Sequence, residues 1–238
     1  MFLGRKIIAI ILARGGSKGI KLKNLKKIGG KSLVYHAAKF CKKLTFLDEA
    51  VLSTDHNLIA KEGLSAGLKV PFKRPKNLSK DLVSDEMVII DVIKKMEKIT
   101  KKKYDIILSL PPTSPFRKKK DIINGIKLLI KKKLDSVWTI NQNDSKNHPY
   151  KQLLITKKNR IKFFSKKGKK IFARQQLQPI YFRDGSAYII SRNTLLKKKT
   201  LITNNTGAII TNNFKISIDT PIDLELANFF YRKFRFKS

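Results

Sequence analysis

Stretches rich in apolar residues alternate along the chain with stretches of helical spacing. The apolar stretches are residues 7–12, 49–53, 104–110 and 136–140, which are typical of strands buried on both faces of a sheet. Between them, residues 32–43, 57–66, 84–96 and 121–130 repeat apolar positions at helical spacing. This alternation predicts an α/β fold with a mainly parallel central sheet and helices on both faces.

The third of these helices has the clearest start signal. Ser84 suits the capping position, and Asp85 and Glu86 follow it in the first turn, where acids complement the helix dipole. We expect its core-facing side chains to be Met87, Ile90, Val92, Ile93 and Met96.

The alternation breaks between residues 141 and 180. Strand-like residues 152–156 and 161–164 flank Lys157–Arg160, which reads as a hairpin turn. The apolar pattern resumes at 187–190, and a last helix is expected from about residue 221. We therefore predict a single domain over residues 1–238 with an inserted β-arm at about 143–180, and we expect this arm to hold a second subunit.

The first apolar stretch, residues 7–12, has two interpretations. A secretion signal would use Arg5 and Lys6 as its charged start, but the apolar core is short and no small-residue cleavage site follows. A membrane span would need about 20 apolar residues. A buried strand fits better. Its polar loop, and the loops after Leu52 and Leu110, would then lie at the carboxyl edge of the sheet, where such folds bind ligands.

The net charge of +36 brings polyanions into consideration as partners. Most of this charge comes from lysines that are spread through every segment. Arginine, by contrast, is the residue that forms bidentate hydrogen bonds with phosphates and bases. We therefore expect nucleic acid to bind only non-specifically, if at all. The single cysteine, Cys41, excludes an internal disulfide and a cysteine metal cluster, so we expect a cytoplasmic protein with no membrane partner.

The loop after the first strand carries the candidate chemistry. Its turn at residues 15–19 (GGSKG) offers backbone N–H groups that suit an anion. It matches neither the Walker pattern nor the GxGxxG fingerprint. Arg14, Lys18, Lys23 and Asn24 surround the turn, and this set suits a triphosphate better than a solvated loop.

Seven motifs give the chain a family resemblance. Residues 11–25 (ILARGGSKGIKLKNL) resemble the opening motif of the CMP-sialic acid synthetases, the acylneuraminate cytidylyltransferases. The later motifs follow in the family's order: LSTD (52–55), PFKRP (71–75), LPPTSPFR (110–117), RQ (174–175), DGSAYI (184–189) and SIDTPIDLE (217–225). The resemblance implies a Rossmann-like nucleotidyltransferase fold and a homodimer joined by the arm. It also implies a reaction in which CTP and a nine-carbon 2-keto sugar acid give the CMP-sugar and pyrophosphate, assisted by Mg²⁺.

The resemblance also implies roles for individual residues. The nucleotide-binding set is Arg14, Ser17, Lys18, Lys23, Asn24, Arg74 and Ser84. The sugar-binding set is Arg174, Gln175, Asp184 and Tyr188. Asp219 and Asp223 are the implied metal ligands, and Arg14, Lys23 and Asp219 the implied catalytic residues. Taken singly, Arg74 also suits a surface ion pair, Tyr188 a core position and Asp219 a helix cap.

Three positions depart from the family's pattern. Pro111 stands where glutamine is usual, Asp184 where asparagine is usual, and Ser217 where a first metal-binding aspartate is usual. The sugar therefore stays open between N-acylneuraminate, legionaminate, pseudaminate and 3-deoxy-octulosonate. A non-catalytic nucleotide-binding or nucleic-acid-binding relative is the alternative from another class.

Overall fold

The computed structural model describes residues 2–211 and 216–234. Its strands and helices, in chain order, are β1 (Ile7–Leu12), β2 (Lys27–Ile28), β3 (Lys31–Ser32), α1 (Leu33–Lys43), β4 (Glu49–Ser53), α2 (Asn57–Ala66), α3 (Asp85–Thr100), β5 (Ile106–Ser109), α4 (Lys119–Lys131), β6 (Ser136–Gln142), β7 (Leu153–Ile155), β8 (Ile161–Phe163), β9 (Tyr181–Ser191), β10 (Thr206–Ile210) and α5 (Pro221–Phe234). Each strand and helix predicted from the hydrophobic pattern is present, with ends that differ by a few residues.

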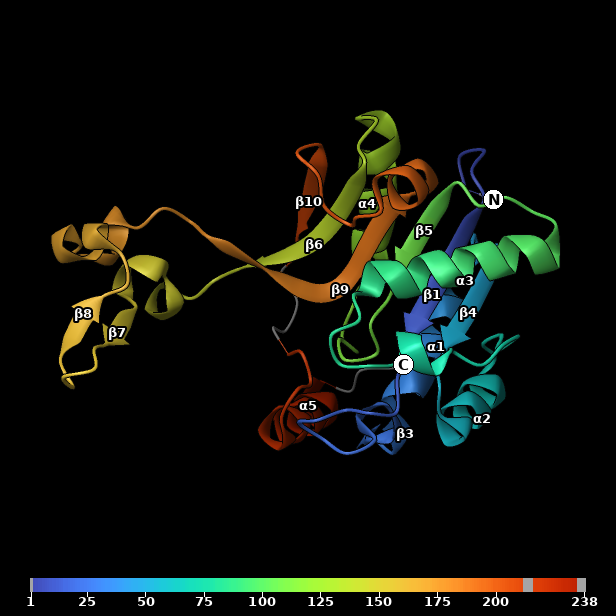
Figure 1. Ribbon diagram of the computed structural model, residues 1–238, viewed down its shortest axis with the longest axis horizontal. Helices are drawn as coiled ribbons and strands as arrows, with labels where there is room; N and C mark the ends of the chain where they lie inside the picture. The colour runs from blue at the N-terminus through green and yellow to red at the C-terminus, as the bar shows by residue number, and fades with distance from the viewer. Residues whose placement is uncertain (1, 212–215, 235–238) are drawn as a thin grey trace.

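A six-stranded sheet forms the centre of the body, in the order β10-β6-β9-β5-β1-β4 (Figure 1). Strand β1 pairs in parallel with β4 and β5, and β10 pairs in parallel with β6. Only β9 runs antiparallel to both of its neighbours in this sheet, β5 and β6. The sheet is thus mainly parallel, and the predicted fold class is confirmed.

Helices cover both faces of the sheet, and β1 shows why its sequence is apolar throughout. Ile7, Ala9 and Ile11 pack in the cluster that contains α1, α2 and α4. Ile8 and Ile10 pack in the opposite cluster, with α3. Because successive side chains of a strand point to opposite faces, a strand covered on both sides has no position left for a polar residue.

Two local predictions need correction. The buried positions of α3 are Val88, Ile89, Val92, Ile93 and Met96, whereas Met87 is 55% exposed and Ile90 is only partly buried. The apolar pattern of α3 is wide enough to allow more than one face, and packing against the sheet selects one of them. Strand β10 was not predicted, because its TGAII sequence is a short edge strand with a glycine and no clear alternation.

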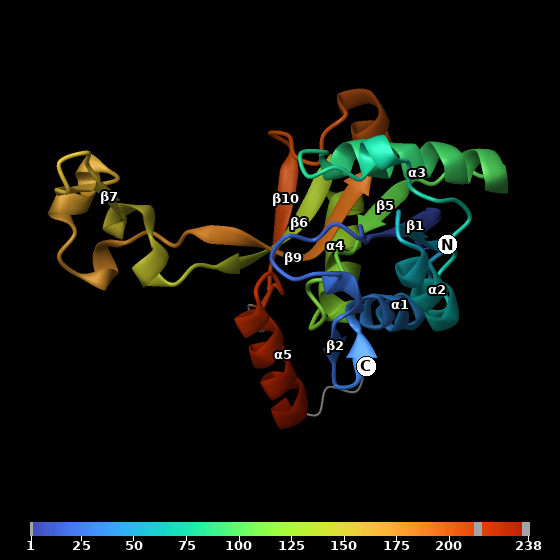
Figure 2. The same ribbon diagram turned by 60° about the horizontal axis from the view of Figure 1, so that its bottom comes forward.

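Residues 143–180 form an arm between β6 and β9. Strands β6 and β9 stay paired past the end of the sheet, with Gln142 opposite Tyr181, and the arm begins where this pair ends. The arm projects away from the body and carries the β7–β8 hairpin (Figures 1 and 2). Several of its apolar side chains face solvent, among them Ile155 at 75%, Ile161 at 70% and Phe172 at 90% exposure.

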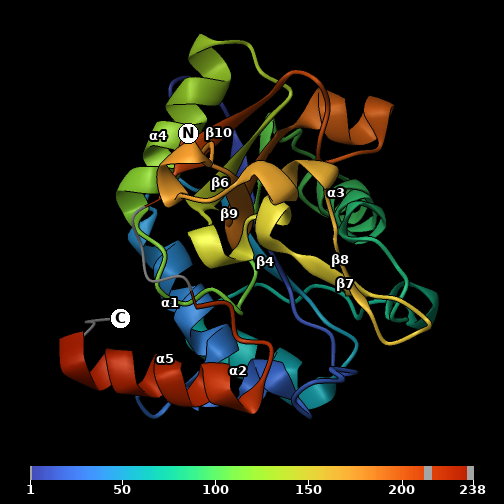
Figure 3. The ribbon, with the colours of Figure 1, turned by 90° about the vertical axis from the view of Figure 1, so that its left-hand side faces the viewer.

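The carboxyl ends of β1, β4 and β5 meet at one edge of the sheet. Helix α5 lies below this edge (Figures 1 and 3). Its Ala227 shares a small buried cluster with Ile20, Leu33 and Phe116. Of the helices in the described ranges, none combines the length and apolarity that a membrane span needs.

Candidate active site

The loop after β1 folds back on itself at the carboxyl edge. The Gly15 N–H donates to Asp55 Oδ1 at 2.9 Å, and the Asn24 side-chain amide donates to the Arg14 carbonyl at 3.0 Å. A β-carbon on Gly15 would lie 2.9 Å from the His56 ring, so this position needs a glycine. The LSTD motif at the end of β4 therefore supports the glycine turn that follows β1.

A polar cavity of about 220 Å³ opens beside this loop. It is lined by Leu12, Arg14, Ser17, Lys18, Lys23, Asn24, Arg74, Asp85, Ser109, Pro111, Pro112 and Thr113. Every residue of the predicted nucleotide-binding set except Ser84 is among them. Ser84 occupies the capping position of α3, next to Asp85, but its side chain accepts no capping hydrogen bond. The contacts of this set with CTP stay a prediction.

Arg74 is anchored under the cavity. Its side chain donates to Ser53, from Nε to Oγ at 3.0 Å and from a terminal nitrogen to the carbonyl at 2.7 Å. Arg74 is only 5% exposed, and this burial lowers the pKa of its guanidinium. It is therefore not the surface ion pair that its sequence also allowed. Arginines titrate so far above neutrality that the group keeps its charge.

Carboxylates neutralise the cations of the loop. Asp81 accepts from Arg14 at 2.8 Å and from Lys18 at 2.7 Å, and Asp219 accepts from Lys23 at 2.7 Å. Sequence analysis missed Asp81, because it lies in an irregular segment between PFKRP and α3 where no periodic pattern marks it. The loop's cations and these carboxylates come from segments far apart in the chain.

Asp219 lies next to the loop and stays accessible. Its side chain is 64% exposed, and its second oxygen accepts from the Ser217 hydroxyl at 3.0 Å. A β-carbon on Gly19 would lie 2.4 Å from the Asp219 carbonyl oxygen, so the two segments approach as closely as a glycine permits. Within the described residues, no group of three or more His, Cys, Asp or Glu side chains is placed to hold a metal. The metal site stays a prediction.

Asp223 caps the start of α5. One of its carboxylate oxygens accepts from the Thr220 N–H at 2.7 Å, the Thr220 hydroxyl at 2.8 Å and the Asp219 N–H at 3.0 Å. The Thr220 hydroxyl accepts from the Asp223 N–H at 3.3 Å in return, which is a capping-box arrangement. Burial raises the pKa of Asp223, but these hydrogen bonds outweigh it and leave the pKa below its ordinary value.

The side chains of Asp184 and Tyr188 both contact other residues of the protein. The Asp184 carboxylate accepts from the hydroxyls of Thr139 at 2.6 Å and Thr211 at 2.5 Å. Gly185 follows at φ +69°, where the register between β6 and β9 shifts. Tyr188 is 8% exposed and packs edge-on against Trp138 at 4.9 Å between ring centroids. Burial raises the pKa of the Tyr188 hydroxyl. A role of either residue in sugar binding stays a prediction.

Arg117 joins two motifs that the sequence treats as separate. Its side chain donates to the Ser186 carbonyl at 3.0 Å and also to the Pro111 carbonyl. The Ser114 hydroxyl donates to the Asp184 carbonyl at 3.0 Å. Burial lowers the pKa of Arg117 to about 10, so it remains charged at neutral pH. The LPPTSPFR and DGSAYI motifs therefore fix one another beside the cavity, which sequence reasoning did not identify.

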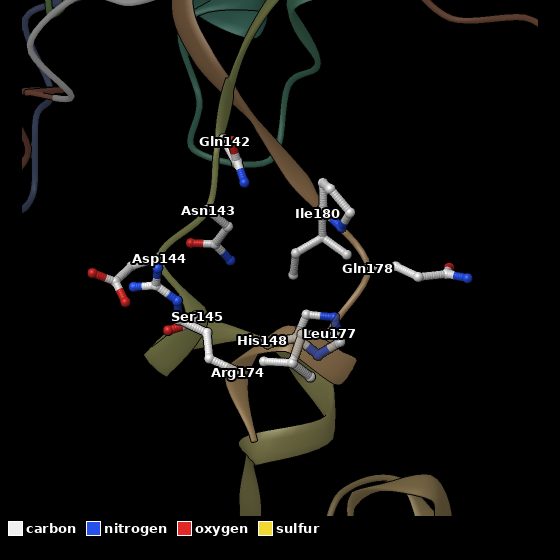
Figure 4. A pocket seen from close by; sticks show the side chains of 10 residues that line it. Gln142, Asn143, Asp144, Ser145, His148, Arg174, Leu177, Gln178 and Ile180 are labelled. Carbon is white, nitrogen blue, oxygen red and sulfur yellow. The ribbon is translucent and has the colours of Figure 1, made fainter. Parts of the chain in front are cut away.

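A second cavity, of about 370 Å³, lies at the base of the arm (Figure 4). Its lining residues are Gln142, Asn143, Asp144, Ser145, His148, Arg174, Leu177, Gln178, Pro179 and Ile180. Arg174 is thus on the arm, whereas Asp184 and Tyr188 are on β9 nearer the body, and Gln175 lines neither cavity. Within one chain, the residues of the predicted sugar-binding set do not line one shared cavity.

The chain is similar to known proteins over nearly its whole length. The sequence profile of the family described as Cytidylyltransferase matches residues 8–236. The chain is 30% identical over 225 residues to a CMP-N,N'-diacetyllegionaminic acid synthase of Legionella pneumophila, covering 93% of this chain and 94% of the relative. It is 28% identical over 232 residues to a pseudaminic acid cytidylyltransferase of Campylobacter jejuni, covering 95% and 97%.

The fold also matches solved structures. A CMP:2-keto-3-deoxy-manno-octonic acid synthetase, solved in complex with CTP, superposes with a TM-score of 0.69. The match covers 96% of this chain and 99% of the other, at 17% identity. At that identity the likeness concerns the fold alone.

Proposed function

The chain belongs to the cytidylyltransferase family, and we propose that it activates a nine-carbon 2-keto sugar acid with CTP, giving the CMP-sugar and pyrophosphate. The observation that carries this proposal is the cavity at the carboxyl edge, where Arg14, Lys18 and Lys23 surround a glycine turn. A triphosphate needs several cations in one place, and this loop brings three of them together around the turn.

In the proposed reaction, the anomeric hydroxyl of the sugar acid attacks the α-phosphorus of CTP. An oxygen–phosphorus bond forms, the bond to pyrophosphate breaks, and the hydroxyl proton is released. Positioning and charge neutralisation dominate the catalysis of such transfers. Arg14, Lys18 and Lys23 would offset the charge of the triphosphate, and Arg74, held rigidly by Ser53, would border the base.

Magnesium is the proposed metal. The Asp219 carboxylate is exposed, adjoins Lys23 of the cavity and offers oxygen, the ligand type that Mg²⁺ prefers. With Ser217 in place of a second acid, phosphate and water oxygens would complete the coordination. When bound, the metal would offset the charge of the phosphate oxygens. Asp223 is a weaker candidate, because three hydrogen bonds already occupy one of its oxygens.

The sugar acid is proposed as a class. The two relatives are named for legionaminic and pseudaminic acids. The neighbouring enzyme for 3-deoxy-octulosonate shares the fold. The hydrogen bonds of Asp184 to Thr139 and Thr211 favour a supporting role for this carboxylate, so its change from asparagine does not by itself exclude any of these sugars.

Pyrophosphate release from CTP tests the proposal. The panel is N-acetylneuraminate, N,N'-diacetyllegionaminate, pseudaminate and 3-deoxy-octulosonate, each with CTP, UTP, ATP or GTP. We expect pyrophosphate release with CTP and at least one nine-carbon acid. Turnover with UTP, ATP or GTP should be lower, because a base that does not match the pocket leaves buried polar groups unsatisfied, at about 1–3 kcal/mol each. Comparable turnover with ATP, or release only with 3-deoxy-octulosonate, would contradict it. CTP binding without pyrophosphate release in the presence of any of these acids would favour the non-catalytic alternative.

A further inference from the structure

Asp81 holds two of the cavity's cations at once. Its carboxylate lies 2.8 Å from the Arg14 guanidinium and 2.7 Å from the Lys18 ammonium, one oxygen to each. Arg14 and Lys18 both line the cavity. Asp81 lies in the turn between Arg74 and α3. A carboxylate from outside the loop therefore neutralises the charges of Arg14 and Lys18.

An anion that bridges an arginine and a lysine is in the position expected of a phosphate group. Phosphate and carboxylate oxygens bind these cations by the same charge-assisted hydrogen bonds. We propose that Asp81 is an internal counter-ion, which occupies Arg14 and Lys18 while the site is empty and is displaced when the triphosphate binds. This inference rests on the proposed function, because it takes the cavity to be the triphosphate site.

The contacts of Asp81 are suited to exchange. The side chains of Asp81 and Lys18 are 40% and 79% exposed, so water weakens their ion pair. The neighbouring Leu82 is fully exposed, so its side chain does not pack against the body at the tip of the turn. A triphosphate brings several charges against the single charge of Asp81. The hydrogen bond from Lys18 keeps the pKa of Asp81 below its ordinary value, so the carboxylate is ionised at neutral pH.

Competition of this kind acts on the product as well as on the substrate. Pyrophosphate leaves the site carrying charges that the same cations hold. A carboxylate that returns to Arg14 and Lys18 competes with pyrophosphate and favours its release. Asp81 therefore weakens the binding of CTP and also shortens the stay of the product.

Titration calorimetry tests the proposal with two probes, CTP and inorganic tripolyphosphate, in the absence of a sugar acid. Asp81→Asn removes the charge and keeps the shape, and Asp81→Ser is a second variant with the same purpose. We expect both to bind both probes about two- to tenfold more tightly than the unaltered protein, the range that two exposed ion pairs supply. Inhibition by pyrophosphate should strengthen by a similar factor.

Asp105→Asn is the matched control. Asp105 is similarly exposed, at 44%, and pairs with Arg5 at 3.8 Å just before β5, at the opposite edge of the sheet. Its loss changes the net charge equally, and affinity for either probe should stay the same. Equal or weaker tripolyphosphate binding by the Asp81 variants would overturn the proposal, whatever CTP does. A gain with tripolyphosphate while CTP binds to no variant would support the counter-ion and refute the proposed function instead.

Discussion

At the scale of residues, we expect single cations of the cavity loop to decide whether the proposed site can hold a triphosphate. Arg14 and Lys23 line the cavity, and each contacts a carboxylate from another segment. Neither contributes to the three buried apolar clusters. Changes at these two positions should therefore separate activity from stability.

Arg14→Ala and Lys23→Ala should each lower kcat/KM by about 10²- to 10³-fold, the effect of losing one preorganised charge-stabilising group. Unfolding free energy should change by less than about 1 kcal/mol, because only a partly exposed ion pair is lost. Steady-state kinetics and urea denaturation measure the two quantities. Arg5→Ala is the matched control, since Arg5 is 54% exposed at the other edge of the sheet. Near-normal kcat/KM in both cavity variants would show that the loop is not the CTP site.

Asp219→Asn and Asp223→Asn should divide metal binding from helix capping. Asp219→Asn should lose activity that higher Mg²⁺ partly restores, because it removes the exposed carboxylate beside Lys23. Asp223→Asn should keep most activity and lose about 0.3–1 kcal/mol of stability, because it removes a negative charge that is favourable near the N-terminus of a helix. Activity against Mg²⁺ concentration, together with thermal unfolding, measures both. Full activity of Asp219→Asn at low Mg²⁺, or of the unaltered protein in EDTA, would contradict the metal site.

The sequence indicated the cations of the site but not what holds them in place. Arg14, Lys18 and Lys23 cluster around glycines within ten residues, so their proximity is visible in the sequence. The hydrogen bond from Arg117 to the distant Ser186 carbonyl, and the ion pairs of Asp81 with Arg14 and Lys18, depend on how separate loops meet at the sheet edge. Contacts between residues far apart in the chain leave no periodic signal.

At the scale of elements, the arm carries apolar side chains that do not pack against the body. Its hairpin exposes Leu153 and Phe163 beside an apolar cavity of about 410 Å³, in addition to Ile155 and Ile161. Monomeric proteins rarely expose contiguous apolar surface of this kind. This observation supports the proposed homodimer joined through the arm.

Light scattering at micromolar concentration should give the mass of a dimer. Ile155→Lys together with Ile161→Lys should shift it toward the monomer, because two charges would be buried in an apolar interface. Leu64→Lys on α2 is the matched control, an exposed leucine at 56% that lies far from the arm in the sequence, and it should leave the mass unchanged. A strictly monomeric unaltered protein would contradict the proposal.

Elements buried on both sides were the most predictable ones. The β1 sequence fits a covered central strand better than a secretion signal. The start of α1 is marked by Ser32, which caps the helix by accepting a hydrogen bond from the Tyr35 N–H at 3.0 Å. The edge strand β10 has less to bury, so its sequence carries less of the pattern. Strand β9 shifts its register against β6 near Gly185, where φ is +69° and a β-carbon would lie 2.9 Å from the Ser114 hydroxyl oxygen. Only the folded chain brings Ser114 to this position.

The whole molecule carries +36, and this charge exceeds what one cavity requires. Nucleic acid should bind weakly, with affinity that falls steeply as salt rises and with no preference for sequence, because dispersed lysines contact phosphates only. Fluorescence anisotropy with labelled oligonucleotides of different sequence, across a salt series, measures this. Tight binding to one sequence at about 150 mM salt would instead support the nucleic-acid-binding alternative.

The way β6 and β9 leave the sheet bears on how such a chain can be altered. The Asn143 N–H still donates to the Ile180 carbonyl at 2.9 Å at the point where the arm begins, so the arm enters and leaves at neighbouring backbone positions. The entropy of closing a chain between two adjacent ends grows slowly with its length. We therefore expect that residues 144–179 can be shortened to a turn without a change in the strand order of the sheet. The arm is therefore a segment whose length can vary separately from the strand order of the sheet.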